Sequence, residues 1–309
     1  MKKQIRGSII LLLGAMIWGA AFVGQDEGMK YFGPFTFNAL RMILAGIALI
    51  PAAFVSVKLT GNRDAMRGKN LKRTVIGGVL CGFFLFLASA TQQLGIKYTA
   101  SPGKSGFITS LYIILVPLVG LLLKKIPQWT VWPCVAIGTL GLFLICGGMD
   151  LSFGTGELML VLCALFFSFQ ITCVDSTMKP GIDPVCLSCV QFITTSVLML
   201  IAMAIIEHPS ITDIASGFKS GWLSVLYVGL MSGAVGYTFQ ILGQRDCPPV
   251  AASMIMSLES VFSALFGWIL VNKKMSGLEL IGSAIVFTAV IIAQIPVKSI
   301  KEIREKHKA

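Results

Sequence analysis

The sequence predicts an all-α integral membrane protein with ten transmembrane helices, arranged as two inverted five-helix repeats. Of its 309 residues, 55% are apolar and only 13% are charged, and the mean hydropathy is +0.84. A soluble protein carries roughly 25% charged residues, so this chain has too few charges to coat a water-facing surface. Ten spans of about 20 residues would occupy about 200 residues. The remainder leaves no room for a soluble catalytic or nucleotide-binding domain.

Ten apolar segments follow one another along the chain, and each is long enough to cross a bilayer. They are residues 7–25, 34–57, 74–96, 101–123, 129–147, 155–176, 184–206, 219–243, 249–271 and 277–296. The formal net charge of +11 does not indicate a nucleic-acid partner, because the basic residues lie in the short stretches between these segments. Most of them lie in the leader, the tail and the loops on the same side. The positive-inside rule therefore predicts a multi-pass protein of the cell (cytoplasmic) membrane with both termini cytoplasmic.

Two stretches of the chain, residues 92–143 and 240–292, show the same order of features. Each begins with Gln and Leu-Gly at the end of a span, and continues through an apolar span, a two-lysine turn and a further span. The offset between the copies is about five spans. Because five is an odd number, the second copy enters the membrane from the opposite side. The predicted units are residues 1–150 and 151–309, the latter with a short basic tail, and such inverted repeats are typical of secondary transporters.

Short motifs stand at characteristic places in these segments. They are Trp18-Gly19 in the first span, Phe35-Thr36-Phe37-Asn38-Ala39-Leu40-Arg41 in the second, Gly106-Phe107-Ile108-Thr109, Tyr112 and Val116-Pro117 in the fourth, Gln240-x-x-x-Gln244 in the eighth and Ser257-Leu258-Glu259 in the ninth. With these motifs the chain resembles the drug/metabolite transporter (DMT) superfamily, specifically its EamA-type members. Ser260 replaces the proline of the family's Leu-Glu-Pro, and the turn at Asn272-Lys273 lacks the usual Gly-Glu. The resemblance implies ten spans in two repeats; similar proteins include exporters of amino acids and related metabolites, and some importers.

Glu259 is the strongest candidate for a functional residue inside the membrane. It lies ten residues past Pro249, about 15 Å into its span at 1.5 Å per residue, which is near the midplane. An ionisable residue there costs about 2.5–3.5 kcal/mol on insertion scales, so its presence indicates a function. Glu259 is predicted to be a protonatable group in a hydrated cavity or a counter-ion for a cationic substrate. The alternative is a carboxyl group that only ties helices together by hydrogen bonds.

Three further residues are candidates for coupling or gating. Arg41 lies about 10 Å into the second span by the same rise. We expect its stem to reach outward toward Asp26 or Glu27 as an anchor, with a substrate contact as the alternative. Lys104, near the outer start of the fourth span, is interpreted as a gating or anchoring charge. Pro117 frees a backbone carbonyl in the fourth span and is predicted to act as a hinge.

Neutral polar and aromatic side chains complete the predicted substrate site. Those expected to bind substrate together with Glu259 are Trp18, Gln93, Tyr112, Gln170, Tyr237 and Gln240, and Gln92 belongs to the same polar group. Trp and Tyr rings can form a face for a cation or an aromatic group. For each residue alone, the alternative is packing or hydrogen bonding between helices.

No cofactor, metal or catalytic residue is expected. Cys186 and Cys189 form a CxxC without a second Cys or His pair nearby, which favours buried small side chains over a metal or redox site. His208 and His307 lie in a loop and the tail, and no HExxH motif is present. An intramembrane enzyme and a non-transporting scaffold or sensor are therefore kept only as alternatives.

Taken together, these features predict a secondary active transporter. Its partners would be the lipid bilayer, a small-molecule substrate and protons, with no nucleic acid. The substrate is expected to be a small organic metabolite, an amino acid or a related compound, moved by alternating access, outward, and coupled to protons or to exchange. A cationic compound such as a quaternary amine, imported or exported in the same fold, is the alternative.

Overall fold

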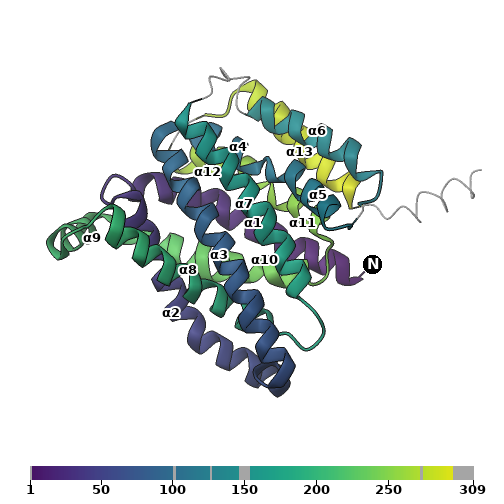
Figure 1. The fold of residues 1–309 in the computed structure, drawn as a ribbon. Coiled ribbons are helices and arrows are strands. Elements are labelled where there is room, and N and C mark those ends of the chain that lie inside the picture. The colour runs from purple at the N-terminus through teal and green to yellow at the C-terminus, as the bar shows by residue number, and fades with distance from the viewer. Residues whose placement is uncertain (1, 100–101, 126, 146–153, 272–273, 295–309) are drawn as a thin grey trace, which may run out of the picture.

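The computed structural model describes residues 2–99, 102–125, 127–145, 154–271 and 274–294, without the side chains of 63, 66, 102–104 and 271, and every regular element in them is a helix (Figure 1). The first half of the chain forms α1 (Lys2–Gly28), α2 (Pro34–Thr60), η1 (Arg63–Met66), α3 (Gly68–Thr99), α4 (Pro102–Ser110), α5 (Tyr112–Leu122) and α6 (Val131–Ile145). The second half forms α7 (Thr155–Thr177), α8 (Pro184–Ile206), α9 (Ile211–Leu226), the π-helix η2 (Tyr227–Gly236), α10 (Tyr237–Gln244), α11 (Pro249–Met256), α12 (Glu259–Val271) and α13 (Gly277–Ala293).

These helices form ten apolar spans in the part of the chain that the structure describes. Eight are long enough to cross a membrane, when α4–α5, α9–η2–α10 and α11–α12 each count as one, and α6 and α13 are shorter apolar helices. The predicted all-α membrane fold is therefore confirmed. Large apolar side chains such as Ile47 and Phe54 of α2 are more than half exposed, as expected where lipid covers the surface. The predicted boundary at residue 150 lies outside the described residues.

The two halves pack against each other reciprocally. Helix α3 of the first half lies along α7 and α8, and the α9–η2–α10 helix of the second half correspondingly lies along α1 and α2. Helices that hold the same place in each half pair directly, α2 with α8 and α6 with α13. Figure 1 shows the α6–α13 pair at one edge of the bundle and α2 at the opposite edge. This reciprocity is the arrangement that two inverted copies of one five-helix unit produce.

The equivalent helices α2 and α8 both begin with a proline, Pro34 and Pro184. Proline suits this position because the first N–H groups of a helix have no partner within the helix. Helix α8 is capped by its own preceding residue. The carboxylate of Asp183 accepts the backbone N–H groups of Val185 at 2.9 Å and Cys186 at 3.0 Å.

Helix α2 receives its cap from a distant part of the chain. Gly33, which precedes it, offers no side chain. Glu207, which follows α8, takes this role, since its carboxylate accepts the backbone N–H groups of Phe35 at 2.9 Å and Thr36 at 2.7 Å, and the Thr36 hydroxyl at 2.6 Å. Glu207 thereby links the end of α8 to the start of α2 at the end of the bundle away from the N-terminus.

Two spans, one in each half, are interrupted near their centres. Leu111 separates α4 from α5, and Ser257 with Leu258 separates α11 from α12. At each interruption the backbone tightens into a 3₁₀-type turn. The N–H of Leu111 donates to the carbonyl of Ile108 at 3.2 Å, and the N–H of Leu258 donates to that of Ile255 at 3.1 Å. From the sequence, the fourth and ninth spans are each predicted to be continuous.

The two interruptions meet at the centre of the molecule. The hydroxyl oxygens of Ser110 and Ser260 are 2.5 Å apart, and the Tyr112 hydroxyl donates to Oε1 of Glu259 at 3.0 Å. Pro117, the predicted hinge, lies inside α5 and not at the interruption. The two interruptions are therefore in direct contact.

Candidate functional site

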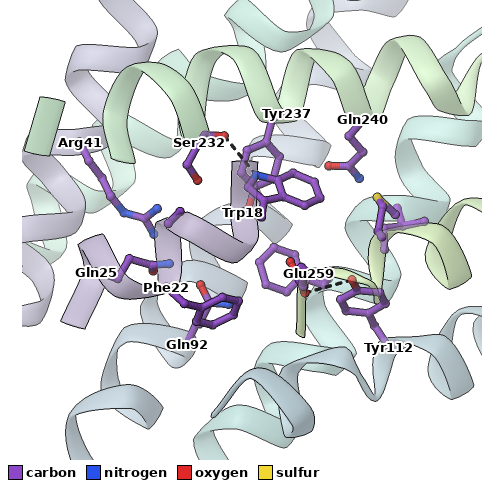
Figure 2. A pocket seen from close by; sticks show the side chains of 14 residues that line it. Trp18, Phe22, Gln25, Arg41, Gln92, Tyr112, Ser232, Tyr237, Gln240 and Glu259 are labelled. Carbon is purple, nitrogen blue, oxygen red and sulfur yellow. Dashed lines mark hydrogen bonds between the residues drawn. The ribbon is translucent and has the colours of Figure 1, made fainter. Parts of the chain in front are cut away.

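A small cavity lies where the interrupted helices meet, and polar and aromatic side chains line it (Figure 2). Its volume is about 40 Å³, which is room for about one or two water molecules. Residues of both halves line it: Trp18, Ala21, Phe22, Gln25, Arg41, Gln92, Tyr112, Phe167, Ile171, Ser232, Tyr237, Gln240, Met256 and Glu259. A metabolite with more than a few heavy atoms does not fit in this conformation, so it could enter only if the helices separate.

Glu259 provides the carboxyl group of this cavity. It is the first residue of α12, is only 6% exposed, and accepts a hydrogen bond from Tyr112, the first residue of α5. The ion pairs found among the described residues do not include Glu259. A buried carboxyl group without a cationic partner can take up and release a proton, or bind a cationic group of a ligand.

Arg41 faces the same cavity, contrary to the expectation that it reaches outward. It is 4% exposed, and its Nε–H donates to Oδ1 of Asn38 at 2.7 Å. Its guanidinium carbon lies 6.0 Å from the centre of the Phe37 ring. Glu27, one of the two expected carboxylate partners, is paired with Lys30 instead. Asn38, one helical turn earlier, holds the guanidinium group inward, which is why the side chain does not follow its stem toward the membrane surface.

An aromatic wall borders the cavity between α1 and α10. The rings of Trp18 and Tyr237 lie 5.0 Å apart, centre to centre, at an angle of 58°. The indole N–H of Trp18 donates to the carbonyl of Ser232 at 3.1 Å, inside the π-helix, a wide helix type that often occurs at functional sites. Gly236 makes room for the indole, because a Cβ atom there would lie 2.7 Å from Trp18 Nε1.

A chain of buried glutamines extends from the cavity into the second half. Nε2 of Gln240, which lines the cavity, donates to Oε1 of Gln170 at 2.8 Å and to Oε1 of Gln244 at 3.0 Å. Nε2 of Gln170 in turn donates to Oε1 of Gln191 at 3.0 Å. Gln170 therefore lies behind the cavity wall and orients Gln240. From the sequence, Gln170 is predicted to bind substrate directly.

The structure brings most of the predicted site residues together. Those that line the cavity are Trp18, Arg41, Tyr112, Tyr237, Gln240 and Glu259. Gln92 lines it as well, whereas its neighbour Gln93 is fully buried elsewhere and its amide has no hydrogen-bond partner within the described residues. Pro117 is buried in α5 away from the cavity, and the side chain of Lys104 lies outside the described residues. That the residues bind substrate stays a prediction.

Several lining residues were missed from the sequence. They are Ala21, Phe22, Gln25, Phe167, Ile171, Ser232 and Met256. The internal repeat carries a signal for two of them, because Phe167 and Ile171 lie 149 residues after Trp18 and Phe22. The polar Gln25 at the end of an apolar segment was a second signal. Nothing in the sequence distinguishes Met256 from the other methionines of the spans.

The CxxC residues lie apart from this cavity. Cys186 and Cys189 are both buried near the start of α8, and the backbone N–H of Cys186 belongs to the Asp183 cap. Within the part of the chain that the structure describes, no three or more His, Cys, Asp or Glu side chains are grouped so that they could hold a metal ion.

Ten apolar spans in two inverted halves, with a cavity lined by residues of both halves, are typical of a membrane transporter. The sequence model of a family described as the EamA-like transporter family matches residues 5–147 and 154–294, one match in each half. The chain belongs to the EamA-like transporter family, and so to the DMT superfamily that its motifs resemble.

The chain is also similar to individual proteins over most of its length. An uncharacterized transporter of Archaeoglobus fulgidus is 24% identical over 96% of this chain and 88% of that protein. A WAT1-related chloroplastic protein of Arabidopsis thaliana is 24% identical over 93% of this chain and 69% of that protein, and the uncharacterized transporter YoaV of Bacillus subtilis is 25% identical over 93% and 94%. A protein of known crystal structure has the same fold, with a TM-score of 0.72 and 17% identity over 93% of this chain and 96% of that one.

Proposed function

We propose that this protein is a secondary active transporter, and not an enzyme or a scaffold. It carries a small organic metabolite, an amino acid or a related compound, across the cytoplasmic membrane by alternating access. One observation carries the proposal: the two interrupted helices, one from each inverted half, meet at a cavity lined by a buried carboxyl group. Irregular backbone at membrane depth is tolerated where it lines a cavity, and interrupted helices of this kind form the cargo sites of many secondary transporters.

Polar contacts at both ends of the bundle support a gating mechanism. At the end that holds the N-terminus, Arg6 is paired with Asp246, and Lys125 with Asp175. At the other end, Glu207 joins α8 to α2. Alternating access requires that the contacts at one end of the bundle break while those at the other end stay formed, so that the cavity opens to one side at a time. Exposed ion pairs are individually weak, which suits contacts that must break in each cycle.

Glu259 is the proposed coupling residue, because its hydrogen bond with Tyr112 joins the two halves at their interruptions. Uptake or release of a proton by this carboxyl group would change that contact and so bias which side is open. Coupling to exchange of a second solute is the alternative. The basic residues Lys2, Lys3 and Arg6 support a cytoplasmic N-terminus. Outward transport of a cytoplasmic metabolite is the proposed direction.

A cationic cargo is the second candidate. The tilted rings of Trp18 and Tyr237 line the same cavity as the carboxyl group of Glu259. Aromatic faces beside a carboxylate can hold a quaternary or primary amine.

The experiment is transport by the purified full-length protein in liposomes, with radiolabelled amino acids and organic amines under imposed pH gradients of both signs. We expect a pH gradient to drive accumulation above that of protein-free liposomes, and Glu259→Gln to abolish it. Glu279→Gln is the matched control, since Glu279 lies at the start of α13, where it caps Ser276, and glutamine preserves that motif. Absence of flux for every solute, in either direction and with folded protein, would refute the proposal.

A further inference from the structure

The cavity contains a second buried charge, the guanidinium group of Arg41, which proton coupling through Glu259 does not require. Taking an ion out of water costs several kcal/mol in a protein interior, and buried cations are normally paired. Among the described residues no carboxylate forms an ion pair with Arg41. Its recorded partners are the amide oxygen of Asn38 and the ring of Phe37.

The fold itself does not need a cation at this place. Arg41 stands seven residues after Pro34, which begins α2, and Gln191 stands seven residues after Pro184, which begins the equivalent helix α8. Gln191 is fully buried and neutral. Because the inverted half is built with glutamine at the matching position, the charge of Arg41 calls for an explanation other than helix packing.

The guanidinium group is oriented so that its outer edge faces the cavity. Its Nε–H is occupied by Asn38, and Nδ2 of Asn38 donates to the carbonyl of Ser89 at 2.9 Å, which fixes the pair from α3. The two terminal nitrogens of Arg41 have no hydrogen bond within the described residues. Figure 2 shows Arg41 reaching into the cavity beside Gln25, which also lines it. The amide oxygen of Gln25 has no partner in the described chain.

We infer that Arg41 binds a carboxylate group of the transported molecule, an inference that rests on the proposed transport function. The fork of guanidinium N–H groups matches the two oxygens of a carboxylate in a bidentate pair. A cargo with only positive charge would instead be repelled, and the repulsion is strong where water is excluded. Where the cargo also carries an ammonium group, Glu259 in the same cavity is its partner.

The test compares acids with their amides, because this change removes the carboxylate and leaves the size nearly constant. Binding to the purified full-length protein is measured by thermal stability and by the change in tryptophan fluorescence, to which Trp18 in the cavity contributes. Transport is measured by flux into liposomes. The panel contains the common amino acids, their amides, straight-chain monocarboxylates and quaternary amines. We expect an acid to bind at least about tenfold more tightly than its amide, as for hydrogen bonds to charged groups. If amino acids bind and straight-chain monocarboxylates do not, the ammonium group contributes to binding. If both bind, the carboxylate is sufficient.

Variants assign that preference to Arg41. Arg41→Gln copies the residue of the second half and is expected to abolish the preference for acids. Arg41→Lys keeps the charge but loses the fork, and should retain part of the preference. Arg73→Gln is the matched control, since Arg73 is exposed near the start of α3 and does not line the cavity.

The outcomes separate this inference from the proposed function. A wild-type protein that transports amides or quaternary amines as well as acids, with Arg41→Lys unchanged, overturns the inference and leaves transport intact. Absence of both binding and flux for all compounds in the wild-type protein overturns the proposed function and with it this inference. If Arg41→Gln does not fold, the acid–amide comparison in the wild-type protein and in Arg41→Lys decides.

Discussion

The two halves of the molecule share one architecture but differ in the charges that they bring to its centre. Arg41 in α2 and Gln191 in α8 stand at the same distance from the proline that begins each helix. Tyr112 and Glu259 each stand first after the interruption of their span. In each pair one half supplies an ionisable group, a cation in one case and a carboxyl group in the other, and its counterpart is neutral.

Other matched positions have remained alike. Gln92 and Gln240, 148 residues apart, both line the cavity, and so do Trp18 and Phe167, 149 residues apart. The repeat therefore accounts for the arrangement of the helices and for several of the residues that line the cavity. The two ionisable groups Arg41 and Glu259 stand at positions where the halves have diverged, and those positions are the ones to change in experiments.

The largest effect is expected from exchanging the residues at the two interruptions. Glu259→Gln should lower gradient-driven transport by about a hundredfold or more, because the ionisable carboxyl group is lost. The double variant Tyr112→Glu, Glu259→Tyr moves that group to the first residue after the interruption in the first half, which is in contact with Glu259. We expect the double variant to give liposome flux within about tenfold of the wild type. Such a recovery relative to Glu259→Gln would show that the two positions are coupled, because the effects of independent sites simply add. If the double variant is as inactive as Glu259→Gln, the halves are not interchangeable at this point.

A smaller effect, on stability, is expected at Gly19, where α1 and α12 approach each other closely. A Cβ atom at Gly19 of α1 would lie 2.8 Å from the backbone nitrogen of Ser263 in α12. Gly19→Ala is therefore expected to destabilise the protein by about 1–3 kcal/mol, as overpacking does. The matching Ser168 of α7, 149 residues later, already carries a side chain.

Ser168→Ala serves as the control for this prediction. It removes a hydrogen bond to the carbonyl of Ala164, but alanine is the better helix former, so a change within about 0.5 kcal/mol is expected. Thermal unfolding of both variants in the same detergent gives the comparison. Equal melting temperatures for Gly19→Ala and the wild type would show that α1 and α12 are not packed as closely as described.

The smallest effect concerns the caps of α2 and α8. Asp183→Asn should be nearly neutral, because Oδ1 alone accepts both N–H groups and the Ser56 hydroxyl, which donates to Oδ2, can accept from an amide instead. Glu207→Gln keeps one acceptor oxygen for three donors, the N–H groups of Phe35 and Thr36 and the Thr36 hydroxyl, and should cost about 1 kcal/mol. Thermal unfolding again measures the difference. A larger loss for Asp183→Asn than for Glu207→Gln would contradict the assignment of the two caps.

Much of the site could be anticipated because buried polar residues are rare in apolar segments. Glu259, Trp18 and Tyr112 are predicted by depth and residue type, and all three line the cavity. Gln170 has the same depth and a polar side chain but lies behind the cavity wall, and Gln93, predicted by its polar side chain, is buried elsewhere. Depth along a span is set by counting residues, but the direction around the helix axis is not.

The sequence by itself determined the number of spans, because each span is a local stretch of high hydropathy. It also determined the inverted repeat, because similar features recur at a nearly fixed offset along the chain. Only the tertiary structure decided which face of each helix turns to the centre, where the two central helices break, and that Arg41 points inward. The physical reason is that lipid and protein interior are both apolar. A membrane helix is apolar on every side, so its sequence lacks the contrast between inner and outer faces that orients a helix in a soluble protein.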